Sequence, residues 1–475
     1  PEPIDDATFL RRVHLDLVGL LPTPHELEDF LADSSADKRT RKIRELLAND
    51  TAYADHWLSF FNDLLRNDYS GTGFITGGRK QISSWLYEAL LYNKPFDQMT
   101  RELIAPSPET QGFADGIKWR GNVSAGQTVE IQFAQSVGQA FLGINLKCAS
   151  CHDSFIDRWT LEESYGLAAI YSQRELEIHR CDKPIGKQAR AGWLFPELGQ
   201  INPDTSREDR LQQLAELMTH PENGRFTRTI ANRIWHRLMG RGIVHPLDAM
   251  QTEPWNADLL DYLAISLSDG EFDLKELIEL IATSESYQSA AEIVDGQDSD
   301  TYVFRGPRSR RMTAEQFLDS VWQMTGSAPA KFDAPVFRTH LDPDQKADFD
   351  LQAKWIWGDS AKGVPPADER IVVRKVIELP AAVKRGGAVL TCDNSHVLFI
   401  NRREVDRGDN WTQVRTLPLH TLLKQGKNDI TVIVHNGGGT PNPAGFFFEA
   451  RLELENGESM TISSDESWDC LLYTS

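Results

Sequence analysis

The chain has 475 residues, of which 50 are lysine or arginine and 70 are aspartate or glutamate, so its formal net charge is −20 at pH 7. A chain of this length is expected to form two to four domains with ample hydrophobic cores. The acidic balance argues against a general nucleic-acid-binding protein, which would present a basic face, and no apolar run approaches the length of a membrane-spanning helix.

The first part of the chain, through about residue 105, carries the apolar spacing of amphipathic helices. Residues 23–26 (Thr-Pro-His-Glu) match a capping box with proline at the first helical position. Residues 54–66 form a strong helical stripe that begins with His56. A lone histidine in such a stripe more often donates a structural hydrogen bond than binds a metal.

Two further helices are predicted on either side of a cysteine-rich segment. Residues 129–141 carry apolar side chains at three- and four-residue steps and are followed by Gly143. Residues 160–163 (Thr-Leu-Glu-Glu) form a second capping box. The segment between them is therefore expected to be a tight loop whose sulfur atoms face one cavity.

Cys148, Cys151 and His152 stand at the C-x-x-C-H spacing. At this spacing two thiols add to the vinyl groups of a haem, and the adjacent imidazole binds the iron. The motif is specific because it fixes three uncommon residues within a short segment. It favours haem c, with Cys148 and Cys151 as covalent anchors and His152 as the proximal iron ligand.

Two other interpretations of the cysteines stay open. The pair alone forms a disulfide or packs as two inert thiols. In the other interpretation, Cys148 and Cys151 join His179 and Cys181 in a tetrahedral zinc site, which leaves His152 without a role.

Large apolar side chains, Phe155 and Trp159, follow the motif. They are suited to wall a cofactor, although aromatic residues near a helix start more often belong to the core. The sixth iron ligand is left open among the remaining candidates, which are His56, His179, Met218, Met239 and Met250.

The segment from Gly143 to Asp153, with residues 157–160 and Tyr165 behind it, resembles the cytochrome-c-like domain of planctomycete-type secreted proteins, a domain of unknown function. Residues 9–24 resemble the usual opening of that domain. The resemblance implies a cytochrome-c-like fold, and the family's biochemical activity does not follow from it. Haem iron and electron transfer are expected from the C-x-x-C-H motif itself, and covalent haem attachment implies an exported protein. One position departs from the family: members often have a histidine two residues after the motif histidine, where this chain has Ser154. The role of that histidine is therefore vacant or filled elsewhere.

A second helical region is predicted from about residue 207 to residue 326. Asn223 and Gly224 precede an apolar helical stripe that ends at Gly240. Residues 221–250, and shorter segments up to about residue 315, resemble the second domain of unknown function that accompanies the first in that family.

Charged side chains are dense in this second region: Arg233, His236, Arg237, Arg241, His245 and Asp248. Such a cluster forms either the wall of an active site or a solvated helix face. The solvated face is the expected arrangement, because charged runs on helices usually face water.

After a linker at residues 327–350, the apolar period changes from helical to alternating. The pattern predicts strands at residues 371–379, 388–392, 396–400, 430–434 and 446–454. Several short strands separated by turns favour an antiparallel sandwich.

This region also resembles the galactose-binding-like jelly-roll modules attached to bacterial glycoside hydrolases, which implies sugar binding or a scaffold role. The resemblance rests on segments that include residues 355–357 and 465–468. Trp355, Trp357 and Trp411 are candidates to stack on sugar rings, although core packing is the commoner role of any one tryptophan.

The ends of the sequence carry two further expectations. The chain starts at Pro1 without a methionine, which we interpret as a truncated or processed start that lacks its leader. Residues 470–475 match the translation of a common sequencing adaptor, so the native sequence is expected to end near Asp469.

The sequence thus predicts two mainly α-helical domains followed by an antiparallel, jelly-roll-like β-sandwich. The helical domains span residues 1–185, which carry the C-x-x-C-H motif, and residues 186–335. The sandwich spans residues 351–469, and residues 470–475 are the adaptor-like tail.

The predicted function is that of a periplasmic or secreted c-type haem protein. It would transfer electrons to a redox partner protein, or perform haem-dependent redox chemistry on a polysaccharide held by the sandwich. The alternative is a non-redox carbohydrate- or protein-binding protein with a zinc ion or a disulfide at the cysteine pair. No serine nucleophile elbow, phosphate-binding loop or H-E-x-x-H zinc motif is present, so enzymatic activity is left open.

Overall fold

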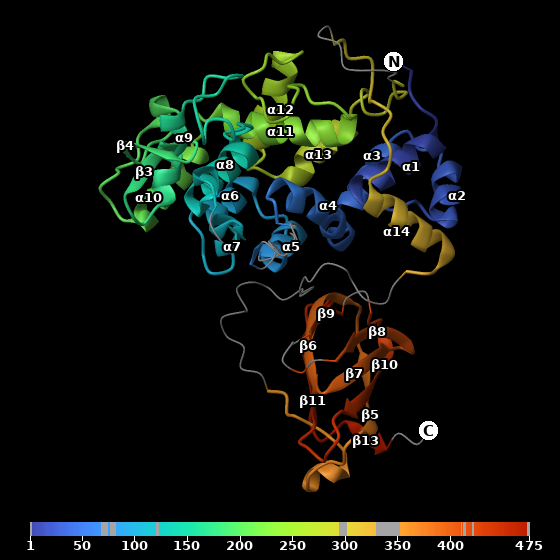
Figure 1. Ribbon diagram of the computed structural model, residues 1–475. Helices are drawn as coiled ribbons and strands as arrows, with labels where there is room; N and C mark the ends of the chain where they lie inside the picture. Colours follow the sequence, from blue (N-terminus) through green and yellow to red (C-terminus); the bar gives the residue numbers. More distant parts are fainter. Residues whose placement is uncertain are drawn as a thin grey trace. The chain divides into compact units, whose positions relative to one another are not determined.

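The computed structural model describes residues 2–67, 75–76, 82–119, 123–293, 302–328, 352–409, 411, 415–419 and 422–472. The chain divides into two compact units, residues 1–328 and residues 329–475. The first unit is built of helices with two small two-stranded sheets, and the second of strands (Figure 1). The linker predicted at residues 327–350 lies almost entirely outside the described residues.

The helical unit begins with seven helices and one pair of short strands. They are α1 (Asp6–Leu17), α2 (Pro24–Ala32), α3 (Lys38–Leu47), α4 (Asp50–Leu64), α5 (Ser83–Leu91), α6 (Phe96–Ile104) and α7 (Gln111–Asp115), with β1 (Ile75–Thr76) paired to β2 (Lys118–Trp119). The capping box at Thr23 and Glu26 starts α2 as the sequence predicts. Trp57 and Phe61 of α4 are completely buried, which accounts for the apolar stripe.

The rest of the helical unit follows the cysteine-rich segment and its flanking helices. Its elements are η2 (Ala125–Gln127), α8 (Val129–Leu142), α9 (Leu161–Tyr171), β3 (Leu176–Arg180), β4 (Lys183–Ala189), η3 (Pro196–Leu198), α10 (Arg207–Met218), α11 (Gly224–Met239), α12 (Ala257–Asp269), α13 (Leu274–Ala282) and α14 (Ala314–Thr325). Gly143 and Gly240 end α8 and α11 with φ of 61° and 81°, the left-handed geometry that favours glycine. None of the described helices is long and apolar enough to cross a membrane.

The two ends of the helical unit are joined through the backbone. The amide of Ile4 donates to the carbonyl oxygen of Gln288 at 2.9 Å, and the amide of Ala290 donates to the carbonyl oxygen of Glu2 at 2.9 Å. Pro3 and Ser289 thereby form an isolated antiparallel bridge. Residues 1–328 thus close on themselves as one compact unit, and the domain boundary near residue 185 stays a prediction.

The second unit consists of two antiparallel sheets. The five-stranded sheet has the order β13-β5-β10-β7-β8 and the four-stranded sheet the order β12-β11-β6-β9. The strands are β5 (Glu369–Leu379), β6 (Val383–Asp393), β7 (Ser395–Ile400), β8 (Arg403–Gly408), β9 (Arg415–Pro418), β10 (Gly426–Asn436), β11 (Gly445–Leu454), β12 (Ser459–Ser463) and β13 (Asp469–Leu472), with a short helix η5 (Asp359–Lys362) before them. The five strands that the sequence predicts are confirmed.

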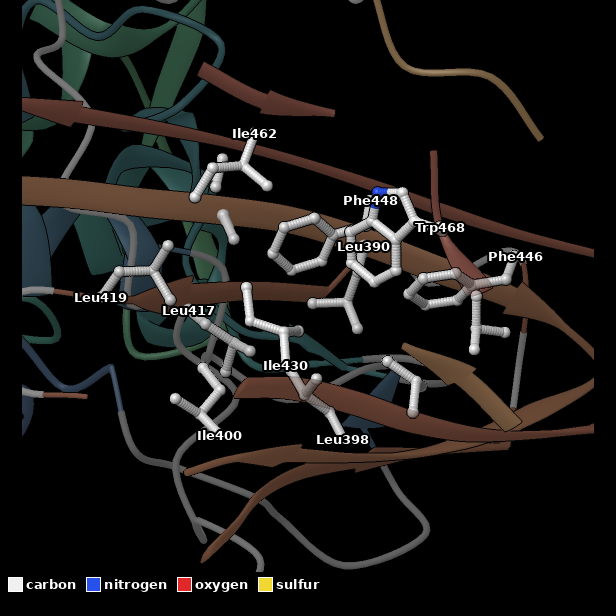
Figure 2. Close-up of a cluster of buried hydrophobic side chains, with 14 of the residues drawn as sticks. Leu390, Leu398, Ile400, Leu417, Leu419, Ile430, Phe446, Phe448, Ile462 and Trp468 are labelled. Carbon is white, nitrogen blue, oxygen red and sulfur yellow. The ribbon is translucent and has the colours of Figure 1, made fainter. Parts of the chain in front are cut away.

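Both sheets contribute to one hydrophobic core (Figure 2). Phe446 and Phe448 of β11 lie on the inner face of one sheet, and Leu398 of β7 and Ile430 of β10 on the inner face of the other. Inward and outward side chains alternate along each strand, because successive side chains point to opposite faces. The arrangement is sandwich-like, and its jelly-roll connectivity stays a prediction.

The adaptor-like tail begins inside this unit. Asp469–Leu472 form the edge strand β13 and pair with Ile371–Arg374 of β5. The last three residues lie outside the described part of the chain.

Candidate functional site

The C-x-x-C-H motif lies on a single turn between α8 and α9, as predicted. The amide of Ser150 donates to the carbonyl oxygen of Leu146 at 2.9 Å, and the amide of His152 donates to that of Cys148 at 3.1 Å. Because these bonds wind the segment into a helical turn, Cys148, Cys151 and His152 occupy neighbouring positions on it. Both cysteines of the turn are half-buried free thiols.

A buried hydrogen bond ties this turn to α8. The side-chain amide of Gln135 donates to the hydroxyl of Ser150 at 2.8 Å, and that hydroxyl donates to the carbonyl oxygen of Leu146 at 2.8 Å. Ser150 is fully buried and Gln135 nearly so. A fully satisfied polar chain of this kind fixes the position of the backbone on which the cysteines sit.

We expect Gln135→Met to lower the free energy of unfolding by about 1 to 2 kcal/mol, because a buried hydrogen bond is lost while the side-chain volume is kept. Urea denaturation of the full chain measures the change. Gln98→Met is the matched control, since Gln98 is exposed on α6 and makes only an i,i+4 bond to Glu102. An equal loss in both variants would mean that the bond to Ser150 does not support the motif turn.

A third cysteine approaches the motif from the β3–β4 hairpin. Cys181 and Asp182 are the turn residues of this hairpin, and Cys181 has a positive φ of 52°. The amide of Cys181 donates to the carbonyl oxygen of Cys151 at 2.8 Å, and the carboxylate of Asp182 accepts from the amide of Ala125 at 2.9 Å. One hydrogen bond therefore holds the hairpin tip against the motif turn, and the other holds it against Ala125 of η2.

The thiol of Cys151 is the most enclosed part of this site. Its Sγ lies so close to Gly126 that a β-carbon added there would sit 3.1 Å away. Burial, followed by the nearby Cys181, Asp182 and Cys148, raises the pKa of the Cys151 thiol. The site therefore favours the protonated thiol of Cys151 over its thiolate until a bond or a cation replaces the proton.

Two histidines at this site hydrogen-bond through Nδ1, which leaves Nε2 as the nitrogen available to a metal. Nδ1 of His152 is 2.8 Å from the carbonyl oxygen of Asp153, and Nδ1 of His179 is 3.0 Å from that of Glu177. A carbonyl oxygen only accepts, so both Nδ1 atoms donate and both Nε2 atoms keep a free lone pair. Histidine ligands of metals commonly hold their second nitrogen in this way.

The two aromatic residues that follow the motif have different surroundings. Phe155 is 86% exposed, as is most of Ile156 beside it, and the Phe155 ring stacks on the His152 ring with centroids 4.4 Å apart. Trp159 is buried in the core, with the Arg158 guanidinium over its ring. Phe155 is therefore available to a cofactor at the surface, and Trp159 belongs to the core.

Within the described ranges, no group of three or more His, Cys, Asp or Glu side chains is arranged to hold a metal ion. The structure brings Cys181 to Cys151 and places His179 on the adjoining strand. Haem attachment at Cys148, Cys151 and His152, and zinc binding by Cys148, Cys151, His179 and Cys181, both stay predictions.

Two family models match the chain. Residues 1–175 match PSCyt2, a protein of unknown function (DUF1549), and residues 209–391 match PSD1, a protein of unknown function (DUF1553). The chain carries these two domains in tandem. The motif turn belongs to the PSCyt2 domain, whereas His179 and Cys181 lie between the two matched segments.

No curated protein matches the chain. Solved structures with partial similarity include an α-L-rhamnosidase of Streptomyces avermitilis complexed with L-rhamnose (22% identity, 26% of this chain and 12% of that chain, TM-score 0.24). Another is the apo form of the Pleurotus ostreatus lectin (23% identity, 26% of this chain and 35% of that chain, TM-score 0.23). This chain spans well under two thirds of either protein, and TM-scores this low carry no argument about function.

The PSD1 domain contains the charged cluster that the sequence places on a solvated helix face, and that expectation is wrong. Arg233 is only 7% exposed, and it lines a cavity together with His236 and Arg237 of the same helix, α11. The two arginines and the histidine share one helix face, because His236 and Arg237 follow Arg233 by three and four residues, and α11 has no acidic residue spaced to pair with them. The lack of acidic residues at pairing distance along α11 is the signal in the sequence that could have indicated a cavity.

The three tryptophans proposed as sugar platforms differ in their exposure to solvent. Trp357 is almost fully buried, and its indole N–H donates to Glu369 at 2.8 Å. Trp355 and Trp411 are about half exposed. Trp357 therefore belongs to the core, whereas Trp355 and Trp411 expose part of their rings to solvent.

Proposed function

We propose that this protein is a c-type haem protein in which Cys148 and Cys151 form the two thioether bonds and His152 binds the iron. The observation that carries the proposal is the hydrogen bond from Nδ1 of His152 to the carbonyl oxygen of Asp153, next to two free thiols on one turn. This bond leaves the Nε2 lone pair for a metal and fixes the ring before any cofactor arrives.

The surface around the motif supports the same proposal. Phe155 and Ile156 expose large apolar side chains directly after the histidine. Exposed apolar side chains gathered at one place usually mark a binding site. A porphyrin held by the two cysteines would remove part of this apolar surface from water.

Each residue of the proposed haem site has a distinct role. Haem supplies a one-electron redox centre when it is bound. Gln135 and Ser150 hold the turn, while the hydrogen bond to Asp153 orients His152. His179 has the matching tautomer and is the candidate we favour for a sixth ligand.

Location and partners follow from this chemistry as parts of the proposal. Covalent haem is attached outside the cytoplasm, so the protein would be periplasmic or secreted and would exchange electrons with a redox partner protein. The exposed rings of Trp355 and Trp411 offer two platforms for a polysaccharide at the β unit.

Three single variants, examined by visible spectroscopy and metal analysis, test the haem proposal. Purified from a host that attaches haem c, the protein should show a Soret band that survives acid-acetone extraction. Cys148→Ser should leave at most one thioether bond, and His152→Ala should shift the spectrum because an axial ligand is lost. Cys181→Ser should leave covalent attachment intact, which makes it the control among the three cysteines.

The zinc alternative predicts the opposite pattern. The approach of Cys181 to Cys151 favours it as the second candidate. In that case the protein is colourless and binds one zinc per chain, Cys181→Ser weakens zinc binding, and His152→Ala has little effect. A colourless protein without zinc would contradict both assignments and leave a thiol or disulfide role.

A further inference from the structure

A cavity of about 420 Å³ opens within the helical unit, apart from the cysteine site. Its walls come from α4, α8, α11 and the segment that leads into α14. The lining residues are Phe60, Asp63, Leu64, Arg66, Gln139, Arg233, His236, Arg237, Gly240, Leu247, Arg310, Arg311, Thr313 and Gln316. This volume lies within the range of pockets that bind small molecules.

The cavity is strongly cationic, although the chain as a whole is acidic. Five of its lining residues are arginines and only one, Asp63, is a carboxylate. Two more carboxylates bind these arginines from the side: Asp248 accepts from Arg233 at 2.7 Å, and Asp16 accepts from Arg310. The carboxylate of Glu315 also acts on Arg237. The five guanidinium groups still outnumber these four carboxylates, so the cavity keeps an excess of positive charge.

Hydrogen bonds to fixed acceptors hold the arginine side chains in place. Arg233 also donates to the backbone carbonyl oxygen of Gln139 at 2.6 Å. Arg66 donates to the side-chain oxygen of Gln139, and Arg310 donates to the carbonyl oxygen of Arg237. Arginines anchored in this way lose little further side-chain entropy when a ligand binds, which is the advantage of a preorganised site.

Burying several cations together is unfavourable unless an anion joins them. Burial lowers the pKa of Arg66, and burial and the neighbouring Arg310 lower the pKa of Arg237. Nδ1 of His236 is buried without a hydrogen-bond partner among the described residues. Burial, followed by His245, Arg310, Arg233 and Arg237, lowers the pKa of His236 to about 4. An anionic ligand would relieve each of these effects.

We propose that this cavity binds a small molecule through an oxyanion, that is, a sulfate, phosphate or carboxylate group. Planar guanidinium groups bind such oxygens in pairs, which is why clustered arginines recognise them so well. Arg237 and Arg311 are the cations we assign to the ligand, since Arg233 already has Asp248 as its partner and Arg310 has Asp16. The cavity and its ligand are independent of haem or zinc at the motif turn.

Calorimetric titration of the full chain tests the proposal with three probes: inorganic sulfate, inorganic phosphate and acetate. Ionic strength is held constant with sodium chloride, because bulk screening alone would otherwise change the signal. We expect saturable binding of at least one probe, and the probe that binds tightest identifies the oxyanion class. Arg311→Gln and Arg237→Gln should each weaken that binding about tenfold, the equivalent of one charge-assisted hydrogen bond.

Arg11→Gln is the matched control, since Arg11 is exposed on α1 and does not line the cavity. It should bind the probe with the affinity of the unmodified chain. Arg311 is itself exposed at the rim, so its replacement should not disturb folding. The proposal is overturned if none of the three probes binds above the chloride background, or if Arg11→Gln weakens binding as much as Arg311→Gln.

Discussion

Replacing Arg233 with methionine is expected to destabilise the helical unit by about 3 to 5 kcal/mol, the usual result of breaking a buried ion pair from one side. Arg233 is buried on α11 and donates both to Asp248 and to the carbonyl oxygen of Gln139. The substitution removes the ion pair of Asp248 with Arg233, leaving the side-chain amide of Gln139 as a donor to this carboxylate, and the carbonyl oxygen of Gln139 loses its bond from Arg233. Urea denaturation of the full chain, followed by far-ultraviolet circular dichroism, measures the loss.

The same helix offers the control for this variant. Arg228 forms an ion pair with Asp261 at 2.5 Å, but both side chains are more than a third exposed. Arg228→Met should therefore cost at most about 1 kcal/mol, because water and salt screen exposed pairs. If Arg228→Met and Arg233→Met lose the same free energy of unfolding, the burial of Arg233 does not strengthen its ion pair. A second variant, in which Asp248→Leu accompanies Arg233→Met, should recover part of the stability.

Acid is expected to destabilise the helical unit through His56, by about 3 kcal/mol between pH 7 and pH 4. His56 is buried, and its Nε2 donates to the carbonyl oxygen of Asp16 at 3.1 Å. Its Nδ1 packs against Gly19, which leaves no room for water on that side of the ring. Burial, with Arg237 and Arg310 nearby, lowers the pKa of His56 to about 3 from the ordinary value of 6.5.

The direction of the effect follows from proton uptake. Below pH 6.5 the unfolded chain protonates His56, while the folded chain does not until about pH 3. Stability is therefore complete above pH 6.5 and falls as the pH decreases. We expect His56→Gln to be less stable than the unmodified chain at pH 7. The difference in free energy of unfolding between the two proteins should be smaller at pH 4 than at pH 7 by about 3 kcal/mol, because the variant has no His56 to protonate.

Urea denaturation at pH 7, 5.5 and 4 measures this difference. The other ionisable groups are the same in both proteins, so their contributions to the pH dependence of stability cancel. His25→Gln is the control, because His25 is exposed on α2. The difference in free energy of unfolding between His25→Gln and the unmodified chain should change with pH far less than that of His56→Gln, because water screens the exposed ion pair of His25 with Asp29. A constant difference for His56→Gln across the same range would contradict the assignment of acid sensitivity to His56.

The sequence predicted well the features that depend on a few neighbouring residues. The capping boxes at Thr23 and Thr160 start α2 and α9, and Gly143 and Gly240 end α8 and α11. Each of these signals acts within one helical turn, so the rest of the chain cannot override it easily. The alternating pattern likewise predicted five strands, but β9, β12 and β13 have too few residues to show a period. The strand β8 is as long as β7, but it is mostly charged and has only one large apolar side chain, Val405.

Features that depend on distant segments were predicted less well. The approach of Cys181 to Cys151 requires a hairpin turn with a positive φ, which the residue types Cys and Asp do not signal strongly. The cationic cavity joins helices that are far apart in the sequence, so its charges appeared as a solvated surface. Burial of a charged side chain is a tertiary property, and only the fold shows that α8 and α14 cover this face of α11.

The bridge between Pro3 and Ser289 also bears on how the protein is made. Residues 2–4 are synthesised well before their partners near residue 290 and wait for them roughly 15 to 60 seconds at ordinary rates of synthesis. Until then the helical unit cannot close, and contacts of such long sequence separation slow its folding further. During that interval Cys148 and Cys151 belong to an incomplete structure.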